Sequence, residues 1–541
     1  MIETAEAMVR CLELEGVKVV FGYPGAAICP FYDYLYRSDK IRHILVRQEQ
    51  NGGHSANGYA RMTGKPAVCI ATSGPGATNL ITAIATAYAD SIPLVVITGQ
   101  VSTDQIGRDV FQEADITGSA EPFVKHSYLV KDATQLPRIM KEAFYLAGTG
   151  RNGPVLIDVP QDIQKVMIDF EYPDSVDLIS YKPTTNGNSL QIKRVAEAIQ
   201  SSNKPLICAG GGVFSAKAQK ELYTFAHTFD IPIVSTMMGI GSVKGTGPLY
   251  MGMIGMHGVP LANKSVKDCD LLILIGARVG DRAVTQPTFL AETTKIIHID
   301  IDPAEIGKNI STDIPLVGDA KKILKKLTET MLQHGNKKYS EWLNVLTLSK
   351  KEPEFKPTPK GTINPKLFIT KLSQKAPKDT TIVADVGQNQ IWTANNFKVQ
   401  DGRLLISCGM GTMGYSVPAS IGAKLAKPQS PVIAICGDGS FQMEFMELAT
   451  AVQHNVPIKV IVMNNQRLGM VCELQNKAYN HHEMAVHLDG NPDFVKLANA
   501  YGIPAIRISD NSEIDGAIDR LFNEQGIFLL ECTVAPNETT L

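Results

Sequence analysis

Short apolar runs alternate with helix-length segments along most of the chain. Early runs include KVVFGYPG, PAVCIATSGPG and PLVVITGQ, and a later run is PVIAICGDG. Each run has the length of one strand and stops at glycine or at a small polar residue. Buried strands separated by helices are typical of parallel sheets covered by helices. The pattern therefore predicts an α/β fold with mainly parallel sheets flanked by helices.

Two polar stretches interrupt this alternation and predict linkers. Residues from about 170 to 190 and from about 333 to 362 are rich in proline, turn-forming and charged residues. We therefore expect three domains, at residues 1–170, 188–333 and 362–541. The first and third share a layout of strand, glycine turn and long helix, in CIATSGPGATNLITAIATAYAD and AICGDGSFQMEFMELATAVQHN. This likeness suggests a duplication.

Composition narrows the class of protein. The chain has 541 residues, 44% hydrophobic residues and a formal net charge of -2, so no polyanion-binding surface is indicated. No apolar stretch approaches the roughly 20 residues that span a bilayer, and the N-terminal segment is typical of an amphipathic helix rather than a secretory signal. The nine cysteines show no CxxC pair. We expect a cytoplasmic protein with no nucleic-acid or membrane partner.

Candidate chemistry stands at the ends of two predicted strands of the third domain. The run Pro431–Cys436 stops at a Gly-Asp-Gly turn containing Asp438, and the run Ile458–Met463 stops at two asparagines, the second being Asn465. Either turn alone would be an ordinary turn. Because ligands of open α/β sheets bind beyond the carboxyl ends of the strands, the pair together predicts a site there. Carboxylate and amide oxygens suit Mg²⁺, which takes further ligands from phosphates.

This spacing of GDG and NN resembles the thiamine diphosphate (ThDP) motif. The resemblance implies that Asp438, Asn465 and the backbone carbonyl of Arg467 hold Mg²⁺ and that the cofactor diphosphate lies on the glycine turn. It also implies the three-domain ThDP-binding fold of the pyruvate oxidase and pyruvate decarboxylase type. Further residues that match cofactor-binding positions of the family are Gly387, Gln388, Asn389, Gly437, Gly439, Ser440, Leu468, Gly469 and Met470.

The opposite end of the cofactor needs an acid, because a carboxylate at the pyrimidine drives its conversion to the imino form. Glu49, in ILVRQEQNGGHSANGYARMTGK, would alone be an ordinary strand-end carboxylate. The resemblance implies that it is this acid, that Gly411 contacts the 4′-amino group and that Met413 supports the bent cofactor. In the family the cofactor lies between the first domain of one subunit and the third of another. The minimal active unit expected is therefore a homodimer.

Within these enzymes the chain is most similar to the large catalytic subunit of acetohydroxyacid synthase (acetolactate synthase). The stretches that carry this similarity are GRDVFQEADITGSAEPFVKHSYLV, MGMIGMHGVPLAN, GARVGDR and QRLGMVCELQ. The reaction implied is decarboxylation of pyruvate and transfer of its two-carbon unit to pyruvate or 2-oxobutyrate, in branched-chain amino-acid biosynthesis. Residues matching the family's active site are Glu49, Phe111, Gln112, Lys125, Arg282 and Met470. Arg282 would bind the acceptor carboxylate.

The family's central domain holds FAD that takes no redox part in the reaction. Residues at matching positions are Gly211, Gly212, Thr236, His257, Arg278, Asp300 and Asp319. The usual Phe-Asp pair after Arg278 is Val279–Gly280 here, which removes one candidate contact. The sequence therefore supports FAD less strongly than it supports ThDP and Mg²⁺.

A second departure concerns substrate choice. Glu473, Leu474 and Gln475 stand where the family commonly has Gln-Trp-Gln, and its tryptophan is associated with a preference for 2-oxobutyrate. We therefore expect weaker discrimination between acceptors. The chain also stops at TVAPNETTL, earlier than relatives whose tail helps cover the site. The sequence leaves open a small regulatory subunit and a dimer of dimers.

Four alternatives stay open at this point. A pyruvate oxidase, a catabolic FAD-free acetolactate synthase or another 2-oxoacid decarboxylase would share the ThDP motifs. A non-catalytic paralogue would keep the fold alone. The presence of Glu49 together with Asp438 and Asn465 argues against that last reading.

Overall fold

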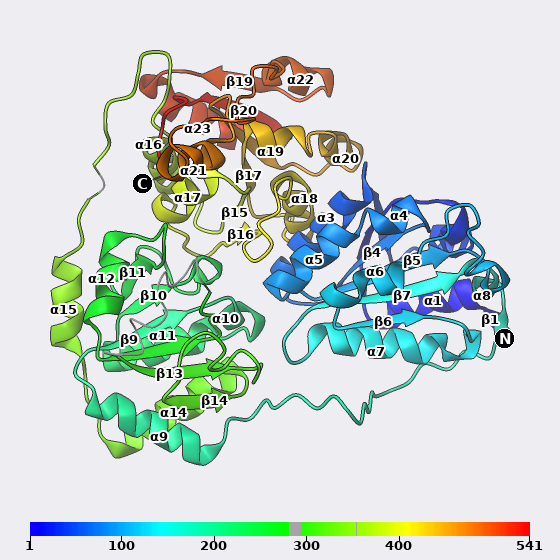
Figure 1. Cartoon of the computed structure of the whole chain (residues 1–541), viewed down its shortest axis with the longest axis horizontal. Helices are drawn as coiled ribbons and strands as arrows, with labels where there is room; N and C mark the ends of the chain where they lie inside the picture. Colours follow the sequence, from blue (N-terminus) through cyan, green and yellow to red (C-terminus); the bar gives the residue numbers. More distant parts are fainter. Residues whose placement is uncertain (281–293, 353, 541) are drawn as a thin grey trace.

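Three parallel sheets form the framework of the chain. The computed structural model describes residues 1–280, 294–352 and 354–540. In these residues each of the three domains is built on one six-stranded parallel sheet flanked by helices (Figure 1). The predicted α/β fold is therefore confirmed. No helix among the described residues is long and apolar enough to cross a membrane.

The first domain places its strands in the order β3-β2-β4-β5-β7-β6. Buried runs such as Val-Cys-Ile in β4 form the centre of the sheet, with hydrophobic clusters on both faces. A short antiparallel pair, β1 (Ile2–Glu3) and β8 (Met167–Ile168), ties the two ends of the domain together. The bounds are β2 Val19–Gly22, β3 Arg42–Leu45, β4 Ala67–Ala71, β5 Leu94–Gln100, β6 His126–Leu129, β7 Pro154–Pro160, α1 Thr4–Leu14, α2 Cys29–Arg37, α3 Glu49–Thr63, α5 Ile81–Asp90 and α7 Leu136–Gly148.

The central domain has the order β11-β10-β9-β12-β13-β14, so the chain reverses direction across the sheet between β9 and β12. Such a switch point is where doubly wound sheets bind dinucleotides. Helix α15 lies inside the predicted linker 333–362, yet its Trp342 and Leu346 belong to the core of this domain. The bounds are β9 Pro205–Ala209, β10 Ile233–Ser235, β11 Tyr250–Met253, β12 Leu271–Ile275, β13 Lys295–Asp300, β14 Ile314–Val317, α9 Ser189–Ser201, α10 Gly212–Ser215, α11 Gln219–Phe229, α12 Pro260–Asp268, α14 Ala320–His334 and α15 Ser340–Leu348.

The third domain has the order β16-β15-β17-β18-β20-β19. Numbered from its first strand, this is the same order as in the first domain, which supports the suggested duplication. The bounds are β15 Thr381–Ala384, β16 Leu404–Ile406, β17 Val432–Gly437, β18 Lys459–Asn464, β19 Ala505–Ile508, β20 Phe528–Thr533, α16 Pro365–Lys375, α17 Gln388–Asn396, α18 Ser416–Ala426, α19 Asp438–Gln442, α20 Glu447–Gln453, α21 Gly469–Ala478, α22 Phe494–Ala500 and α23 Ile514–Asn523.

Helices α3 and α18 join the first domain to the third and lie side by side (Figure 1). Their backbones approach so closely that glycine is required on both. A Cβ placed on Gly58 would lie 2.0 Å from the carbonyl oxygen of Ala419, and one placed on Gly422 would lie 1.8 Å from that of Ser55. Because backbone atoms cannot rotate away as side chains do, this crossing fixes how the two domains sit on each other.

Candidate active site

The two strand-end motifs of the third domain leave neighbouring strands at one edge of the sheet. Strand β17 ends at Gly437, which is paired with Met463 of the adjacent strand β18. Asp438 begins helix α19 directly after β17, and Asn465 follows the last residue of β18. The structure therefore brings the Gly-Asp-Gly turn and the Asn-Asn turn side by side.

Hydrogen bonds connect the two turns through Asn491. The backbone N–H of Gln466 donates to Asn464 Oδ1 at 3.2 Å, inside the Asn-Asn turn. The side-chain amide of Asn491 donates to Asp438 Oδ2 at 2.6 Å and to Asn464 Oδ1 at 3.4 Å. Asp438 itself is buried, with 1% of its surface exposed, and this burial raises the pKa of its carboxyl to about 6. A cation at this edge would favour the ionised carboxylate.

The oxygen groups at this edge fit a hard cation bound with a diphosphate. They are the Asp438 carboxylate, the Asn465 side-chain oxygen, which accepts the Arg467 N–H at 3.2 Å, and the carbonyl of Arg467. Among the described residues no group of three or more His, Cys, Asp or Glu side chains could hold a metal. An ion here would therefore complete its shell from phosphate and water oxygens, as Mg²⁺ does.

Gln388, at the start of α17, closes one side of the same edge. Its Oε1 accepts the Asn465 amide at 2.8 Å, and its Nε2 donates to the carbonyl of Glu538 at 2.7 Å and to the Glu473 carboxylate. A Cβ on Gly469 would lie 1.9 Å from Gln388 Oε1, so a larger residue there would displace the Gln388 side chain. Gln388 therefore stands between the metal-site asparagine and α21.

The remaining diphosphate-side candidates surround these groups. Gly387 has φ +132°, a conformation that favours glycine, and Asn389 beside it is buried with its Oδ1 unpartnered among the described residues. Ser440 Oγ accepts the Gly437 N–H at 3.1 Å. A buried oxygen without a partner is an acceptor that a ligand or water would satisfy.

The loop 407–416 carries the two residues expected at the pyrimidine. Gly411 has φ +66°, and a Cβ built on it would meet no heavy atom within 4 Å. The Met413 side chain lies 3.8 Å from a Cβ placed on Gly439, which itself would contact Leu468 at 2.9 Å. The structure thus brings Met413 and Leu468 over the Gly-Asp-Gly turn, while Gly411 faces open space.

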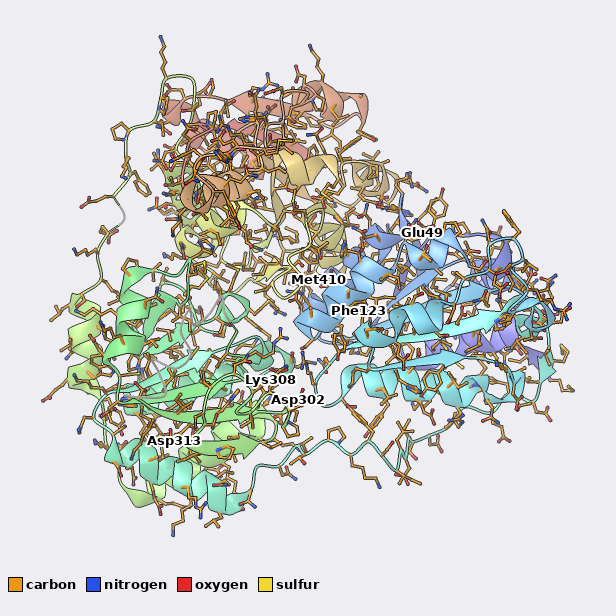
Figure 2. All side chains as sticks on the ribbon, viewed as in Figure 1. Glu49, Phe123, Asp302, Lys308, Asp313 and Met410 are labelled. Atoms are coloured by element: carbon orange, nitrogen blue, oxygen red, sulfur yellow. The ribbon has the colours of Figure 1, made fainter. Side chains whose placement is uncertain are left out.

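Glu49 begins α3 on the first domain and is half-buried (Figure 2). Asn79 donates to Glu49 Oε2 at 2.9 Å, and a Cβ on Gly76 would lie 3.4 Å from Glu49 Oε1. Gln112 packs on the same turn, 2.8 Å from a Cβ placed on Gly74. The turn 74–79 therefore gathers Glu49, Asn79 and Gln112 on one face of the first domain.

Other candidates of the first and third domains are placed less centrally. Phe111 is 86% exposed, and Met470 is half-buried in the first turn of α21. Lys125 donates to the carbonyls of Thr149, at 2.8 Å, and Leu146, and burial lowers its pKa to about 8. The structure therefore directs Lys125 into its own domain and not toward Glu49. Arg282 lies outside the described residues.

The central-domain candidates stand at the carboxyl ends of the strands, on both sides of the switch point. Gly211 and Gly212 follow β9, Thr236 follows β10 and Arg278 follows β12. Asp300 ends β13, and its pKa is raised to about 6, chiefly because it is buried. A group with adjacent hydroxyls or a diphosphate fits such an edge.

Several of these residues also have a structural use. A Cβ on Gly212 would lie 2.7 Å from Gly276, so Gly212 allows two turns to touch. Asp319 caps α14 by accepting the Lys322 N–H at 3.0 Å, and Arg278 donates to the carbonyl of Ala89 in the first domain at 2.5 Å. His257 accepts a hydrogen bond at its carbonyl from Asn395 at 2.9 Å.

Three residues of the site have no counterpart in the sequence-based predictions. Asn491 lies in a loop 53 positions after Asp438 and belongs to no motif. Asn79 stands in the Gly-Pro-Gly-Ala-Thr-Asn turn, whose glycines were a signal for it. Glu473 was noticed only as a departure, and it accepts hydrogen bonds from the Thr540 N–H at 2.7 Å and its hydroxyl at 2.8 Å as well as from Gln388.

Comparisons with known proteins agree with this geometry. Three family models, described as the N-terminal TPP binding, central and C-terminal TPP binding domains of thiamine pyrophosphate enzymes, match residues 2–119, 192–327 and 385–532. A probable acetolactate synthase large subunit of Methanocaldococcus jannaschii is 46% identical over 99% of this chain and 92% of its own length. An acetolactate synthase of Arthrospira platensis is 43% identical (99% and 94%), and an acetolactate synthase large subunit of Corynebacterium glutamicum is 44% identical (95% and 84%).

Proposed function

The chain belongs to the acetolactate synthase large-subunit family of thiamine pyrophosphate enzymes, and from this membership we propose its reaction in detail. The enzyme makes 2-acetolactate from two pyruvate molecules and 2-aceto-2-hydroxybutyrate from pyruvate and 2-oxobutyrate, in the biosynthesis of valine, leucine and isoleucine. The observation that carries this proposal is the meeting of the Gly-Asp-Gly and Asn-Asn turns, which Asn491 connects by donating to both the buried Asp438 and Asn464.

In this proposal the third domain holds the diphosphate end of the cofactor. Asp438, Asn465 and the carbonyl of Arg467 bind Mg²⁺, and the glycine turn leaves room for phosphate oxygens. When bound, thiamine diphosphate supplies a carbon nucleophile for the 2-oxo group and an electron sink that lets carbon dioxide leave. Support comes from the unpartnered oxygen of Asn389 and from the hydrogen bond between Gln388 and Asn465.

Glu49 holds and releases the proton at the pyrimidine end. A half-buried carboxylate that, among the described residues, accepts one amide donor and contacts no cation is suited to that task. The nearby Phe111 is 86% exposed in one chain. An exposed aromatic side chain beside a site supports a second copy of the chain covering it, and hence a homodimer or a dimer of dimers.

The residues proposed to contact the substrates are chosen by charge and size. Arg282 offers a guanidinium to the acceptor carboxylate, and Gln112, Met470 and Lys125 line the approach. In the structure Lys125 donates to carbonyls of its own domain, so its part in the site requires the side chain to leave them. Relatives named large subunits imply a small regulatory subunit as a further partner.

FAD binds in the central domain under this proposal, without a redox role. The glycine turn after β9, the switch point and the strand-end Asp300 support a dinucleotide there. The absorbance of flavin in protein purified without added cofactor measures this directly. If the protein retains no flavin even after it has been saturated with FAD and unbound FAD removed, the FAD-free catabolic synthases would be favoured instead.

Product analysis with pyruvate, ThDP and Mg²⁺ tests the reaction. We expect acetolactate from the natural chain and at least a 100-fold loss of kcat in Glu49→Gln, because general acid–base groups contribute about that much. Glu121→Gln, an exposed glutamate of the same domain, is the matched control and should stay within twofold.

Other products would replace the proposal with one of its alternatives. Acetaldehyde would indicate a decarboxylase, and hydrogen peroxide with acetyl phosphate or acetate would indicate an oxidase. An inactive protein that binds ThDP would indicate a non-catalytic paralogue.

A further inference from the structure

The loop 407–416 is fixed to the rest of the chain at both ends and in the middle. At its far end the Asp385 carboxylate accepts the N–H groups of Gly414 at 3.1 Å, Tyr415 at 3.0 Å and Ser416 at 2.8 Å. In the middle, the hydroxyl of Thr412 meets that of Thr86 at 2.7 Å. The residues expected at the cofactor, Gly411 and Met413, lie between these fixed points.

The near end of the loop is held by a carboxylate from a different domain. Asp90, the last residue of α5, accepts the Gly409 N–H at 2.7 Å on Oδ1 and the Cys408 N–H at 3.2 Å on Oδ2. The loop rests directly on the helix end, since a Cβ on Gly409 would lie 2.9 Å from the carbonyl oxygen of Ala89. Figure 2 labels Met410 at this junction.

Asp90 is in turn held in one orientation. It is 5% exposed, and Arg61 donates to its Oδ2 at 2.7 Å. Arg61 also donates from Nε to Asn57 Oδ1 at 2.9 Å, and the same oxygen accepts the Tyr415 hydroxyl at 2.8 Å. A buried ion pair whose remaining groups are hydrogen-bonded keeps both side chains fixed, because either charge left alone would be costly.

In the proposed homodimer these contacts connect two cofactor sites through one helix, because each site takes its first domain and its third domain from different chains. Glu49 begins α3 and Arg61 lies in its last turn. Helix α3 therefore presents the proposed acid to one cofactor site at its start and, through Arg61 and Asp90, supports the third-domain loop of the other site at its end.

We propose that Asp90 is a positioning residue for thiamine diphosphate: it fixes the turn 408–413 so that Gly411 and Met413 meet the pyrimidine end of the cofactor. The inference rests on the proposed placement of the cofactor at these two residues. The Asp90 carboxylate matters here because it accepts both the Gly409 and the Cys408 N–H groups at the end of α5 and so satisfies two backbone donors of the turn at once. Loss of the charge would leave Arg61 unpaired and the turn free to shift.

The experiment compares two buried aspartates of the first domain. Asp90→Asn keeps the shape of the side chain and removes its charge. Asp158→Asn makes the same replacement at a residue that is 1% exposed and that, among the described residues, accepts hydrogen bonds from Thr98 at 2.7 Å and Gln100 at 2.9 Å in its own domain. Burial raises the pKa of Asp158 to about 7, so this control matches the change of side chain and burial but removes less charge. ThDP binding is measured with Mg²⁺ by quenching of protein fluorescence, and unfolding temperature is measured without cofactor.

We expect Asp90→Asn to raise the Kd for ThDP by about 10- to 100-fold, the range for losing hydrogen bonds to a charged group. Asp158→Asn should change it by less than threefold even where its unfolding temperature falls as far. Equal Kd values for Asp90→Asn and the natural chain, or equal losses in both variants, would overturn the inference. A natural chain that fails to bind ThDP would overturn the proposed function instead.

A milder variant keeps the test decisive if Asp90→Asn does not fold. Thr86→Val removes the hydroxyl that meets Thr412 and preserves the shape of the side chain. It should raise the Kd for ThDP about three- to tenfold, since one neutral hydrogen bond to the loop is lost; the other bond lost, to the carbonyl of Thr82, lies within α5. An unchanged Kd in folded Thr86→Val would show that the loop does not need its support from the first domain.

Discussion

The glycine crossing of α3 and α18 gives a prediction whose size follows from the coordinates. In Gly422→Ala the new Cβ would lie 1.8 Å from the carbonyl oxygen of Ser55, whereas ordinary contacts begin at 3.4 Å. The 1.6 Å that is lacking has to come from moving one helix, because both neighbours are backbone atoms. Overpacking of this kind costs up to about 3 kcal/mol or more. Alanine in a helix returns about 1 kcal/mol relative to glycine, so the net loss is about 2 kcal/mol.

The assay is thermal unfolding of the cofactor-free protein. A net loss of about 2 kcal/mol corresponds to a fall in Tm of about 4–8 °C for domains of this size. Gly516→Ala in α23 is the matched control, since its Cβ would meet nothing within 4 Å. It should gain about 0.5–1 kcal/mol and raise Tm by a few degrees. A Gly422→Ala protein that melts at or above the natural chain would refute the argument that this contact sets the domain arrangement.

Three further predictions concern the site. The pKa of Asp438 is raised to about 6 in the metal-free protein, so the contribution of this carboxyl to stability is present at low pH and is lost as the pH rises toward 6. Mg²⁺ needs the ionised carboxylate, so in titrations between pH 5 and 7.5 it should bind about tenfold more weakly for each pH unit below 6. Glu473→Gln removes a negative charge that contacts Gln388, so the ThDP concentration for half-saturation should fall several-fold; an increase would contradict this. Leu474, 54% exposed, stands at the family's usual tryptophan, and Leu474→Trp should raise the ratio of 2-aceto-2-hydroxybutyrate to 2-acetolactate when pyruvate and 2-oxobutyrate compete.

The sequence predicted best the two strands that lead into the site and the residues at which they end. The run expected at Pro431–Cys436 is β17 at Val432–Gly437, and the run expected at Ile458–Met463 is β18 at Lys459–Asn464, because long buried runs have few other solutions. Asn491 was missed because it reaches the site from a loop with no local pattern. The orientation of Lys125 was equally unpredictable, since carbonyls of residues 146 and 149 compete for its ammonium.

The first and third sheets have the same strand order, which is the arrangement that duplication of one domain would produce. In each copy the third strand, β4 or β17, leads into a glycine turn: Gly74-Pro75-Gly76 in one and Gly437-Asp438-Gly439 in the other. The two turns differ in what they contact. The turn of the third domain carries Asp438, a carboxylate suited to a cation, whereas the turn of the first domain carries a proline and packs against Glu49. The two turns also differ in their backbone: Gly74 has φ +60° and lies beyond the end of β4, whereas Gly437 has φ -81° and is the last residue of β17.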